Sequence, residues 1–357
     1  MKMVTAAEVQ TTVEAFEDPQ FGKNLKSLKM LKGVSLDGSS ATIQIELPTP
    51  AYPNRPALED AIQSSVRSAH ADVDQVNVQF TSVVRGKDSG AKVGLKVKNV
   101  IAVGSGKGGV GKSTVAASLA YGLKHYGATV GLMDADVYGP SIPHLLGATG
   151  QPAMKQIQTP DGKTIERIVP IEVDGIKLMS MGFMVGEDQA IVWRGPMLHK
   201  ALSQFLQQTE WGELDYLVVD MPPGTGDVAL TLSQMVQLAG AVVVCTPQKV
   251  ALLDAGKAIS MFKTVKIPIL GMVENMTGEI FGQGGAKKKA EEMGVSFLGE
   301  LPSIAEVRVR GDEGKISALV NEENPAQQPI LDITSNVAME IAKEILKNPT
   351  MPTLEIL

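Results

Sequence analysis

Residues 106–114 of the chain read Gly106-Lys107-Gly108-Gly109-Val110-Gly111-Lys112-Ser113-Thr114, which satisfies the phosphate-loop pattern G-x-x-x-x-G-K-[ST]. An apolar run precedes this stretch, and helical spacing begins at Lys112. A glycine-rich turn between a strand and a helix lets backbone N–H groups surround a phosphate, and the helix N-terminus adds partial positive charge. We therefore expect these nine residues to bind a nucleotide.

The segments around this motif alternate between short apolar runs and helical spacing. Continuous apolar strands between helices indicate a mostly parallel sheet covered by helices on both faces, an α/β fold of the P-loop NTPase class. The expected strands are Val100–Val103, Thr129–Met133, Ile165–Val173, Ile176–Met181, Leu217–Val219, Ala241–Cys245, Ile269–Val273 and Ser296–Leu298, and the expected helices are Lys112–Tyr126, Pro196–Gln208, Asp227–Leu238, Ala251–Thr264, Gly285–Met293 and Gln328–Leu346.

The first part of the chain has a different texture and predicts a separate small α+β domain. Thr5 followed by Glu8 is a capping-box pattern, which predicts a helix over Ala6–Phe16. We expect domains at residues 1–95 and 96–347 and a loosely held tail at residues 348–357. The other expected elements are strands at Ser27–Leu36, Ala41–Leu47 and Val76–Val84 and a helix at Ala57–Ala69.

The composition is that of a globular protein, with 357 residues, 44% hydrophobic and 20% charged side chains and a net charge of −6. It excludes a disordered chain and argues against a dedicated nucleic-acid binder. No apolar run approaches the roughly 20 residues of a membrane helix, and Met1–Phe16 lacks the apolar core of a secretory signal. Cys245 is the single cysteine, which fits a reducing cytosol. We therefore expect a cytoplasmic protein that binds neither nucleic acid nor membrane.

The candidate catalytic chemistry lies in the phosphate loop and at two strand ends. Lys112 can reach the β- and γ-phosphates, and the Ser113 hydroxyl can ligate Mg²⁺. Asp220 ends an apolar strand and is expected to hold Mg²⁺ through water. Asp134 and Asp136 follow another strand, and ligands bind at the carboxyl ends of parallel strands. Asp136 is the catalytic candidate of the two, and Asp134 is alternatively a loop cap.

The sequence also offers candidates for sensing the γ-phosphate and for recognising the base. Gly224 is placed so that its N–H could sense a γ-phosphate, and the loop around it could reorder on hydrolysis. No Asn-Lys-x-Asp string of the guanine-binding type occurs, so ATP is favoured over GTP. Asn275 follows an apolar strand, and its amide offers both a donor and an acceptor.

The nine-residue string resembles the deviant phosphate loop of the MinD, ParA and nitrogenase-iron-protein superfamily. The resemblance implies a homodimer in which Lys107 reaches the other subunit's nucleotide and neutralises transition-state charge; the alternative is a solvated loop lysine. It further implies that Asp136 orients the attacking water and that Asn275 binds the adenine edge. Pro302 resembles part of another adenine-contacting stretch and is equally explained as a strand-ending residue.

Further strings narrow the resemblance: Asp134-Ala135-Asp136-Val137-Tyr138-Gly139-Pro140-Ser141-Ile142-Pro143, Trp193-Arg194-Gly195-Pro196-Met197 and Asp220-Met221-Pro222-Pro223-Gly224-Thr225-Gly226-Asp227. They are similar to the Mrp family of ATPases, described as iron–sulfur cluster carriers. Residues 1–95 resemble the small iron–sulfur-assembly domain that often precedes this ATPase. The resemblance implies a slow, Mg²⁺-dependent, homodimeric ATPase that acts in iron–sulfur cluster assembly or transfer, with apo-proteins or assembly factors as partners.

The chain departs from the Mrp family where a cluster would bind. Many members carry a Cys-x-x-Cys pair after the Glu-Asn-Met string, whereas this chain continues Glu274-Asn275-Met276-Thr277-Gly278-Glu279-Ile280-Phe281. Cys245 ends an apolar strand, which is typical of an inert core residue. A dimer would supply two thiolates, and such a cluster normally takes four. The sequence therefore weakens direct cluster ligation.

Two other functions stay open at this point. The missing cysteines favour an ATP-gated adaptor or scaffold that carries no cluster. A positioning ATPase like MinD or ParA would act on membrane or DNA, but the end of the chain, Lys347–Leu357, lacks the basic amphipathic helix of MinD-type proteins.

Overall fold

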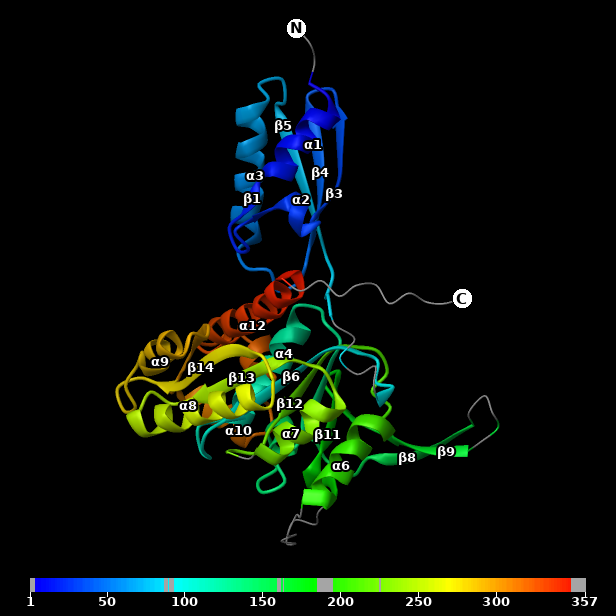
Figure 1. Cartoon of the computed structure of the whole chain (residues 1–357), viewed down its shortest axis with the longest axis vertical. Coiled ribbons are helices and arrows are strands. Elements are labelled where there is room, and N and C mark those ends of the chain that lie inside the picture. The colour runs from blue at the N-terminus through cyan, green and yellow to red at the C-terminus, as the bar shows by residue number, and fades with distance from the viewer. Residues whose placement is uncertain are drawn as a thin grey trace. The chain divides into compact units, whose positions relative to one another are not determined.

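The computed structural model describes residues 4–86, 89, 93–158, 162, 164–184, 195–224 and 226–347. The chain divides into two compact units, residues 1–85 with 342–357 and residues 86–341 (Figure 1). The sequence-based limits at residues 95/96 and 347/348 stay a prediction, and the expected tail lies outside the described residues. Among the described helices, none combines the length and apolar character that a membrane span requires.

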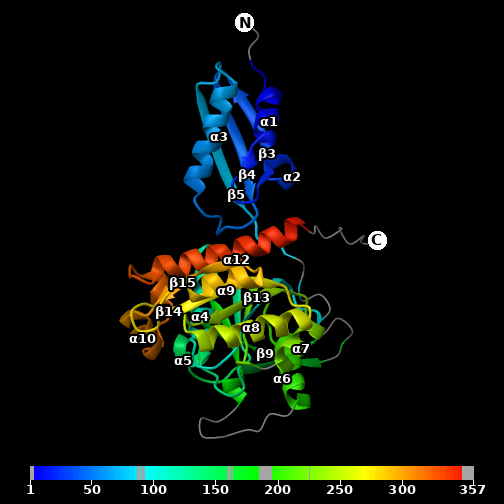
Figure 2. The ribbon, with the colours of Figure 1, turned by 60° about the vertical axis from the view of Figure 1, so that its left-hand side comes forward.

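The first unit is built on a three-stranded sheet with helices on one face (Figures 1 and 2). Its buried face takes apolar side chains from alternate positions of the central strand, such as Ile43 and Ile45. The predicted capping box is present, since Thr5 accepts a hydrogen bond from the Glu8 N–H and the Glu8 carboxylate accepts one from the Thr5 N–H. The elements are α1 (Ala6–Ala15), β3 (Leu31–Asp37), β4 (Ser40–Leu47), α3 (Arg55–Ala69) and β5 (Gln75–Ser82), with β3 antiparallel and β5 parallel to β4.

The predicted strand at Ser27–Leu36 is wrong at its beginning. A short helix, α2 (Leu25–Leu28), occupies that part, because the Asn24 side chain caps it by accepting a hydrogen bond from the Ser27 N–H. Lys29 ends the helix in a left-handed conformation with φ 55°, and β3 begins only at Leu31. Before it, β1 (Glu17–Asp18) and β2 (Lys23–Asn24) form a small antiparallel hairpin.

The second unit contains the large sheet, and the predicted α/β fold class is confirmed. The sheet has eight strands in the order β10-β11-β7-β12-β6-β13-β14-β15, and within it only the β10–β11 pair is antiparallel. Its strands are β6 (Val97–Ser105), β7 (Val130–Asp134), β10 (Ile171–Val173), β11 (Ile176–Ser180), β12 (Leu214–Asp220), β13 (Leu238–Cys245), β14 (Ile269–Thr277) and β15 (Phe297–Pro302).

Helices cover both faces of this sheet (Figures 1 and 2). On one face, α4 (Lys112–His125) packs on the central strands, and α12 (Gln327–Lys347) packs on α4 so closely that a Cβ on Gly122 would lie 2.2 Å from Thr334 Oγ1. The other face buries Trp211, Phe205 and Phe262. The helices on that face are α6 (Gly195–Gln208), α7 (Gly226–Met235), α8 (Lys249–Thr264) and α9 (Gly285–Met293), and the short helices α5 (Ile142–Leu146), α10 (Ala305–Asp312) and α11 (Ala318–Asn321) complete the unit.

The segment between α5 and α6 differs from the expectation. The predicted strand at Ile165–Val173 is two strands, β9 (Thr164–Val169) and β10, separated by Pro170, which has no N–H for a ladder. β9 pairs with β8 (Ala153–Gln158), a strand that the sequence did not reveal, in an antiparallel hairpin. Trp193 and Arg194, quoted above for the family resemblance, lie outside the described residues.

Candidate functional site

The phosphate loop lies where the strand order of the large sheet reverses. It follows β6, which has β12 on one side and β13 on the other, and β7 lies beyond β12. In open parallel sheets, the crevice at such a reversal, at the carboxyl ends of the strands, is the usual ligand site. β6, β7 and β12 all run in parallel, so Ser105, Asp134 and Asp220 end their strands at this same edge.

Two features of the phosphate loop require glycine. Gly109 and Gly111 both adopt φ 78°, a left-handed conformation that residues with a Cβ rarely adopt. Gly106 lies against α8, where a Cβ would sit 2.1 Å from the backbone carbonyl carbon of Asp254. The Ser105 hydroxyl donates to the Lys107 carbonyl at 2.9 Å and so tightens the start of the loop.

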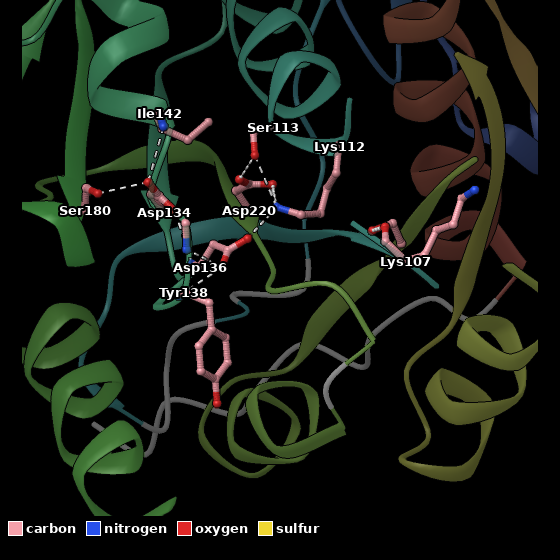
Figure 3. A network of polar contacts seen from close by, with 11 residues as sticks. Lys107, Lys112, Ser113, Asp134, Asp136, Tyr138, Ile142, Ser180 and Asp220 are labelled. Carbon is pink, nitrogen blue, oxygen red and sulfur yellow. Dashed lines mark hydrogen bonds and ion pairs between the residues drawn. The ribbon is translucent and has the colours of Figure 1, made fainter. Parts of the chain in front are cut away.

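Lys112 is buried among carboxylates rather than extended into solvent (Figure 3). Its Nζ lies 2.7 Å from Asp220 Oδ1 and 3.5 Å from Asp136 Oδ2. The Ser113 hydroxyl donates to Asp220 Oδ2 at 2.5 Å. Burial raises the pKa of Asp220, and the adjacent Lys112 ammonium opposes that rise. The arrangement gathers a cation, a hydroxyl and two carboxylates at the N-terminus of α4.

Asp134 and Asp136 hold the loop that follows β7. Asp134 accepts hydrogen bonds from the Asp136 N–H, the Ile142 N–H and the Ser180 hydroxyl, at 3.1, 3.3 and 2.9 Å (Figure 3). These bonds match the loop-cap interpretation of Asp134. Burial raises the pKa of Asp134 to about 8, and the negative charge of Asp220 adds to the rise. Asp136 accepts from the N–H groups of Tyr138 and Gly139 and directs its other oxygen to Lys112.

Other predicted site residues lie further from this cluster. Lys107 is directed away from Lys112 and Asp220 (Figure 3). The N–H of Gly224 donates to the Ser105 carbonyl at 3.0 Å, so this donor is engaged with the start of the phosphate loop. Pro302 ends β15, opposite Thr277 of β14. Of the remaining predicted loop residues, Val110 is buried, Gly108 and Gly109 are exposed and Thr114 is intermediate.

Asn275 contacts the phosphate loop. Its Nδ2 donates to the Val110 carbonyl oxygen at 2.9 Å, in a buried position. The preceding residue, Glu274, is fully buried and accepts hydrogen bonds from the N–H groups of Gly284 and Ala286, at the start of α9.

Sequence reasoning missed two of these polar groups, Ser180 and Glu274. Each stands at the carboxyl end of an apolar strand, Ser180 at the end of β11 and Glu274 within the last residues of β14. The signal that could have revealed them is a polar side chain at the end of an apolar run, the same signal that predicts the aspartates and Asn275 as site residues.

The donor set fits a magnesium–nucleotide complex. Mg²⁺ prefers oxygen ligands, and the Ser113 hydroxyl and the Asp220 carboxylate lie side by side at the loop. The same cannot be said of an iron–sulfur cluster. Cys245 is 1% exposed, and burial raises the pKa of its thiol to about 12, with a contribution from the charge of Glu274. A buried, protonated thiol is a poor metal ligand, so the core interpretation of Cys245 agrees with the structure.

Comparisons with known proteins give two family matches. A family model described as a NUBPL iron-transfer P-loop NTPase matches residues 96–338, and one described as an iron–sulfur cluster assembly protein matches residues 6–80. The chain is 45% identical over 342 residues to the iron–sulfur cluster carrier protein of Deinococcus radiodurans, covering 92% of this chain and 93% of that protein. It is 40% identical over 348 residues to the protein of the same name from Escherichia coli K12, covering 94% and 92%.

Solved structures resemble about two thirds of this chain. A nucleotide-binding protein from Archaeoglobus fulgidus in complex with ADP is 36% identical, with a TM-score of 0.54 over 65% of this chain and 91% of that chain. The cell division ATPase MinD of Pyrococcus furiosus has a TM-score of 0.51 at 19% identity, over 67% and 98%, and shares the fold.

Proposed function

The chain belongs to the family of iron–sulfur cluster carrier proteins, which are P-loop NTPases, and on that premise we propose that it binds and hydrolyses MgATP to drive iron–sulfur cluster assembly or transfer to apo-proteins. The observation that carries the proposal is the buried position of Lys112 between Asp220 and Asp136 at the phosphate loop. The Lys112 ammonium can bind the negatively charged phosphates of a nucleoside triphosphate. The two carboxylates can bind a divalent cation.

The phosphate loop supplies the binding groups. Backbone N–H groups of residues 106–114 surround the phosphates, and the N-terminus of α4 adds partial positive charge. Lys112 moves its ammonium from the carboxylates to the β- and γ-phosphates. Ser113 directly and Asp220 through water would hold Mg²⁺, which would neutralise charge on the same phosphates. The Gly224 N–H donates to the γ-phosphate once it has given up its hydrogen bond to the Ser105 carbonyl.

Hydrolysis requires an oriented water and stabilisation of the charge that develops on the γ-phosphate. Asp136 orients the water for in-line attack from the loop that follows β7. Lys107 acts on the nucleotide of a second copy in a homodimer, which agrees with a side chain directed away from its own Lys112 cluster (Figure 3). A charge supplied in trans ties hydrolysis to dimer closure, since each site is incomplete without the other copy.

The cluster is the cargo in this proposal, and Cys245 is not its ligand. The thiol is buried within β13, and its pKa is raised to about 12. Because each chain has one cysteine, a cluster would need ligands other than the cysteines of this chain. The names of the relatives favour a cluster role over the adaptor and over a MinD-like or ParA-like positioning function.

Activation of an apo iron–sulfur protein tests the proposal. The purified protein, an iron source, sulfide and the apo-protein are combined without oxygen, with MgATP or without nucleotide. We expect MgATP to accelerate activation of the apo-protein and Lys112→Ala to abolish that acceleration. Iron and sulfide per dimer are measured in parallel for wild type and Cys245→Ser. Equal activation with and without MgATP would contradict the proposal, and cluster binding that is lost in Cys245→Ser would contradict the core assignment of Cys245.

A further inference from the structure

The amide of Asn275 is bonded to the phosphate loop itself. Its Nδ2 donates to the carbonyl oxygen of Val110 at 2.9 Å, across 165 positions of sequence. Asn275 is 3% exposed and Val110 is 2% exposed, so water does not compete freely for this bond. A buried amide–carbonyl bond of this kind holds two segments in one relative position.

The next residue of the loop is shaped around the same amide. A Cβ on Gly111 would lie 2.1 Å from Asn275 Nδ2 and 3.3 Å from the Met276 methyl carbon. Gly111 also has φ 78°. The Asn275 amide therefore lies in the space that a side chain at Gly111 would need. At this point the backbone of the phosphate loop packs directly against the Asn275 side chain.

The end of β14 is distorted where it presents Asn275. The pairing with β15 shifts register between Asn275, opposite Leu301, and Thr277, opposite Pro302. Met276 lies between them with φ 61°, a conformation that is uncommon for a residue with a Cβ. Such strain persists only where the surroundings stabilise it, and here the two neighbours of Met276 are fixed, Asn275 by the phosphate loop and Thr277 by β15.

We propose that Asn275 is a positioning residue of the phosphate loop, acting through the Val110–Gly111 peptide. The carbonyl and the N–H of a trans peptide point in opposite directions, and no peptide bond among the described residues is cis. With the Val110 carbonyl directed to Asn275, the Gly111 N–H lies in the same peptide plane and points in the opposite direction, away from Asn275. Asn275 thereby keeps a repelling carbonyl away from the phosphates and a donor available to them. This inference rests on the proposed function and adds a role for Asn275 in phosphate binding. An adenine contact alone would leave phosphate binding unchanged.

A base-free ligand separates the two roles of Asn275. Binding of MgATP and of magnesium tripolyphosphate is measured by calorimetry for wild type, Asn275→Asp and Asn275→Ala. Both substitutions remove the amide donor, and the aspartate keeps the shape of the side chain. We expect about tenfold weaker binding of both ligands, since an unsatisfied buried carbonyl typically costs about that factor. The control is Asn336→Ala, because Asn336 Nδ2 also donates to a backbone carbonyl, that of Leu298, at 2.9 Å. It should bind both ligands as wild type does.

A second measurement needs no ligand. Hydrogen–deuterium exchange of a peptide covering residues 106–114 should be faster in both Asn275 variants and unchanged in Asn336→Ala. Weaker MgATP binding with unchanged tripolyphosphate binding and unchanged exchange would overturn the proposal and leave Asn275 as an adenine ligand. Wild-type behaviour of both Asn275 variants in every assay would also overturn it. If the aspartate variant does not fold, the alanine variant carries the test, and if wild type does not bind MgATP, it is the proposed function that fails.

Discussion

Lys112 Nζ lies 2.7 Å from Asp220 Oδ1, although 108 positions of sequence separate the two residues. The contact arises because β6 and β12 are neighbours in register, with Val103 opposite Asp220, so that the loop after one strand meets the carboxylate that ends the other. Both side chains are buried, at 6% and 0% exposure. Each buried charge is therefore stabilised in part by the other, which links nucleotide binding to the stability of the fold.

The two lysines of the phosphate loop should differ in both binding and stability. Lys112→Ala should abolish ATP binding and lower the free energy of unfolding by about 3 kcal/mol, because Asp220 is left buried without its partner. Lys107→Ala should bind ATP normally, lose hydrolysis by about a thousandfold if it acts in trans, and change stability by less than about 0.5 kcal/mol. Calorimetry, phosphate release and urea unfolding measure the three effects. Equal hydrolysis by Lys107→Ala and wild type would refute the role in trans.

Asp220 should matter for the metal more than for the nucleotide. Asp220→Asn removes the anionic oxygen that we assign to Mg²⁺, so hydrolysis should fall by about a hundredfold or more. ATP binding without Mg²⁺ should be preserved or improved, because Lys112 loses its competing carboxylate. A titration of ATP with and without Mg²⁺ tests this, and Asp215→Asn, at an aspartate in the same strand that pairs with Lys98, is the control. An unchanged Mg²⁺ dependence in Asp220→Asn would rule out the metal assignment.

The thiol of Cys245 should be inert in the folded protein. Its pKa is raised to about 12, so the thiolate fraction stays very small through pH 10 and rises only as the pH approaches that value. An exposed cysteine with a pKa of about 8.5 would be largely ionised by pH 9. Labelling with a thiol reagent at pH 7, 8 and 9 should therefore be at least about a hundredfold slower than in urea, where one thiol per chain reacts. Rapid native labelling that follows an ordinary pKa would show that Cys245 is accessible.

Close packing at Gly104 should make it intolerant of a side chain. A Cβ there would lie 2.6 Å from the ring of Phe262, which is buried on the face of the sheet covered by α8. Gly104→Ala should lower the free energy of unfolding by about 1–3 kcal/mol through overpacking. Gly226→Ala is the matched control, because its Cβ would make an ordinary contact of 3.8 Å at the start of α7 and alanine favours a helix. Urea unfolding that ranks the two variants in the opposite order would contradict this account.

Much of the fold and of the site was predictable because the signals are local. The apolar runs that became β6, β7, β12, β13 and β14 are buried along nearly their whole length, and such strands can be recognised in a sequence as continuous apolar stretches. The half-exposed strands were harder. β8 has one intermediate and otherwise exposed positions, so it offers no apolar pattern, and α2, α5 and α11 have at most five residues, too few for a helical period to show.

Within the site, the residues that are contiguous in the sequence were predictable, and the contacts between residues far apart in the sequence were not. The prediction that Asn275 binds adenine rests on a family resemblance, whereas its bond to Val110 depends on the strand order β6-β13-β14, which brings the end of β14 near the loop that follows β6. The prediction for Gly224 could not include the bond from its N–H to Ser105.

The sequence by itself determined the phosphate loop, the identity of its lysines and hydroxyl, the aspartates at strand ends and the lack of a Cys-x-x-Cys pair, because each of these is contained in a few adjacent residues. Only the tertiary structure decided that Lys112 is shared between Asp220 and Asp136, that Asp134 caps its own loop with help from Ser180, and that Asn275 holds Val110. These contacts depend on strand order and register, which bring together side chains that are 24 to 165 positions apart in the chain and which no local pattern specifies.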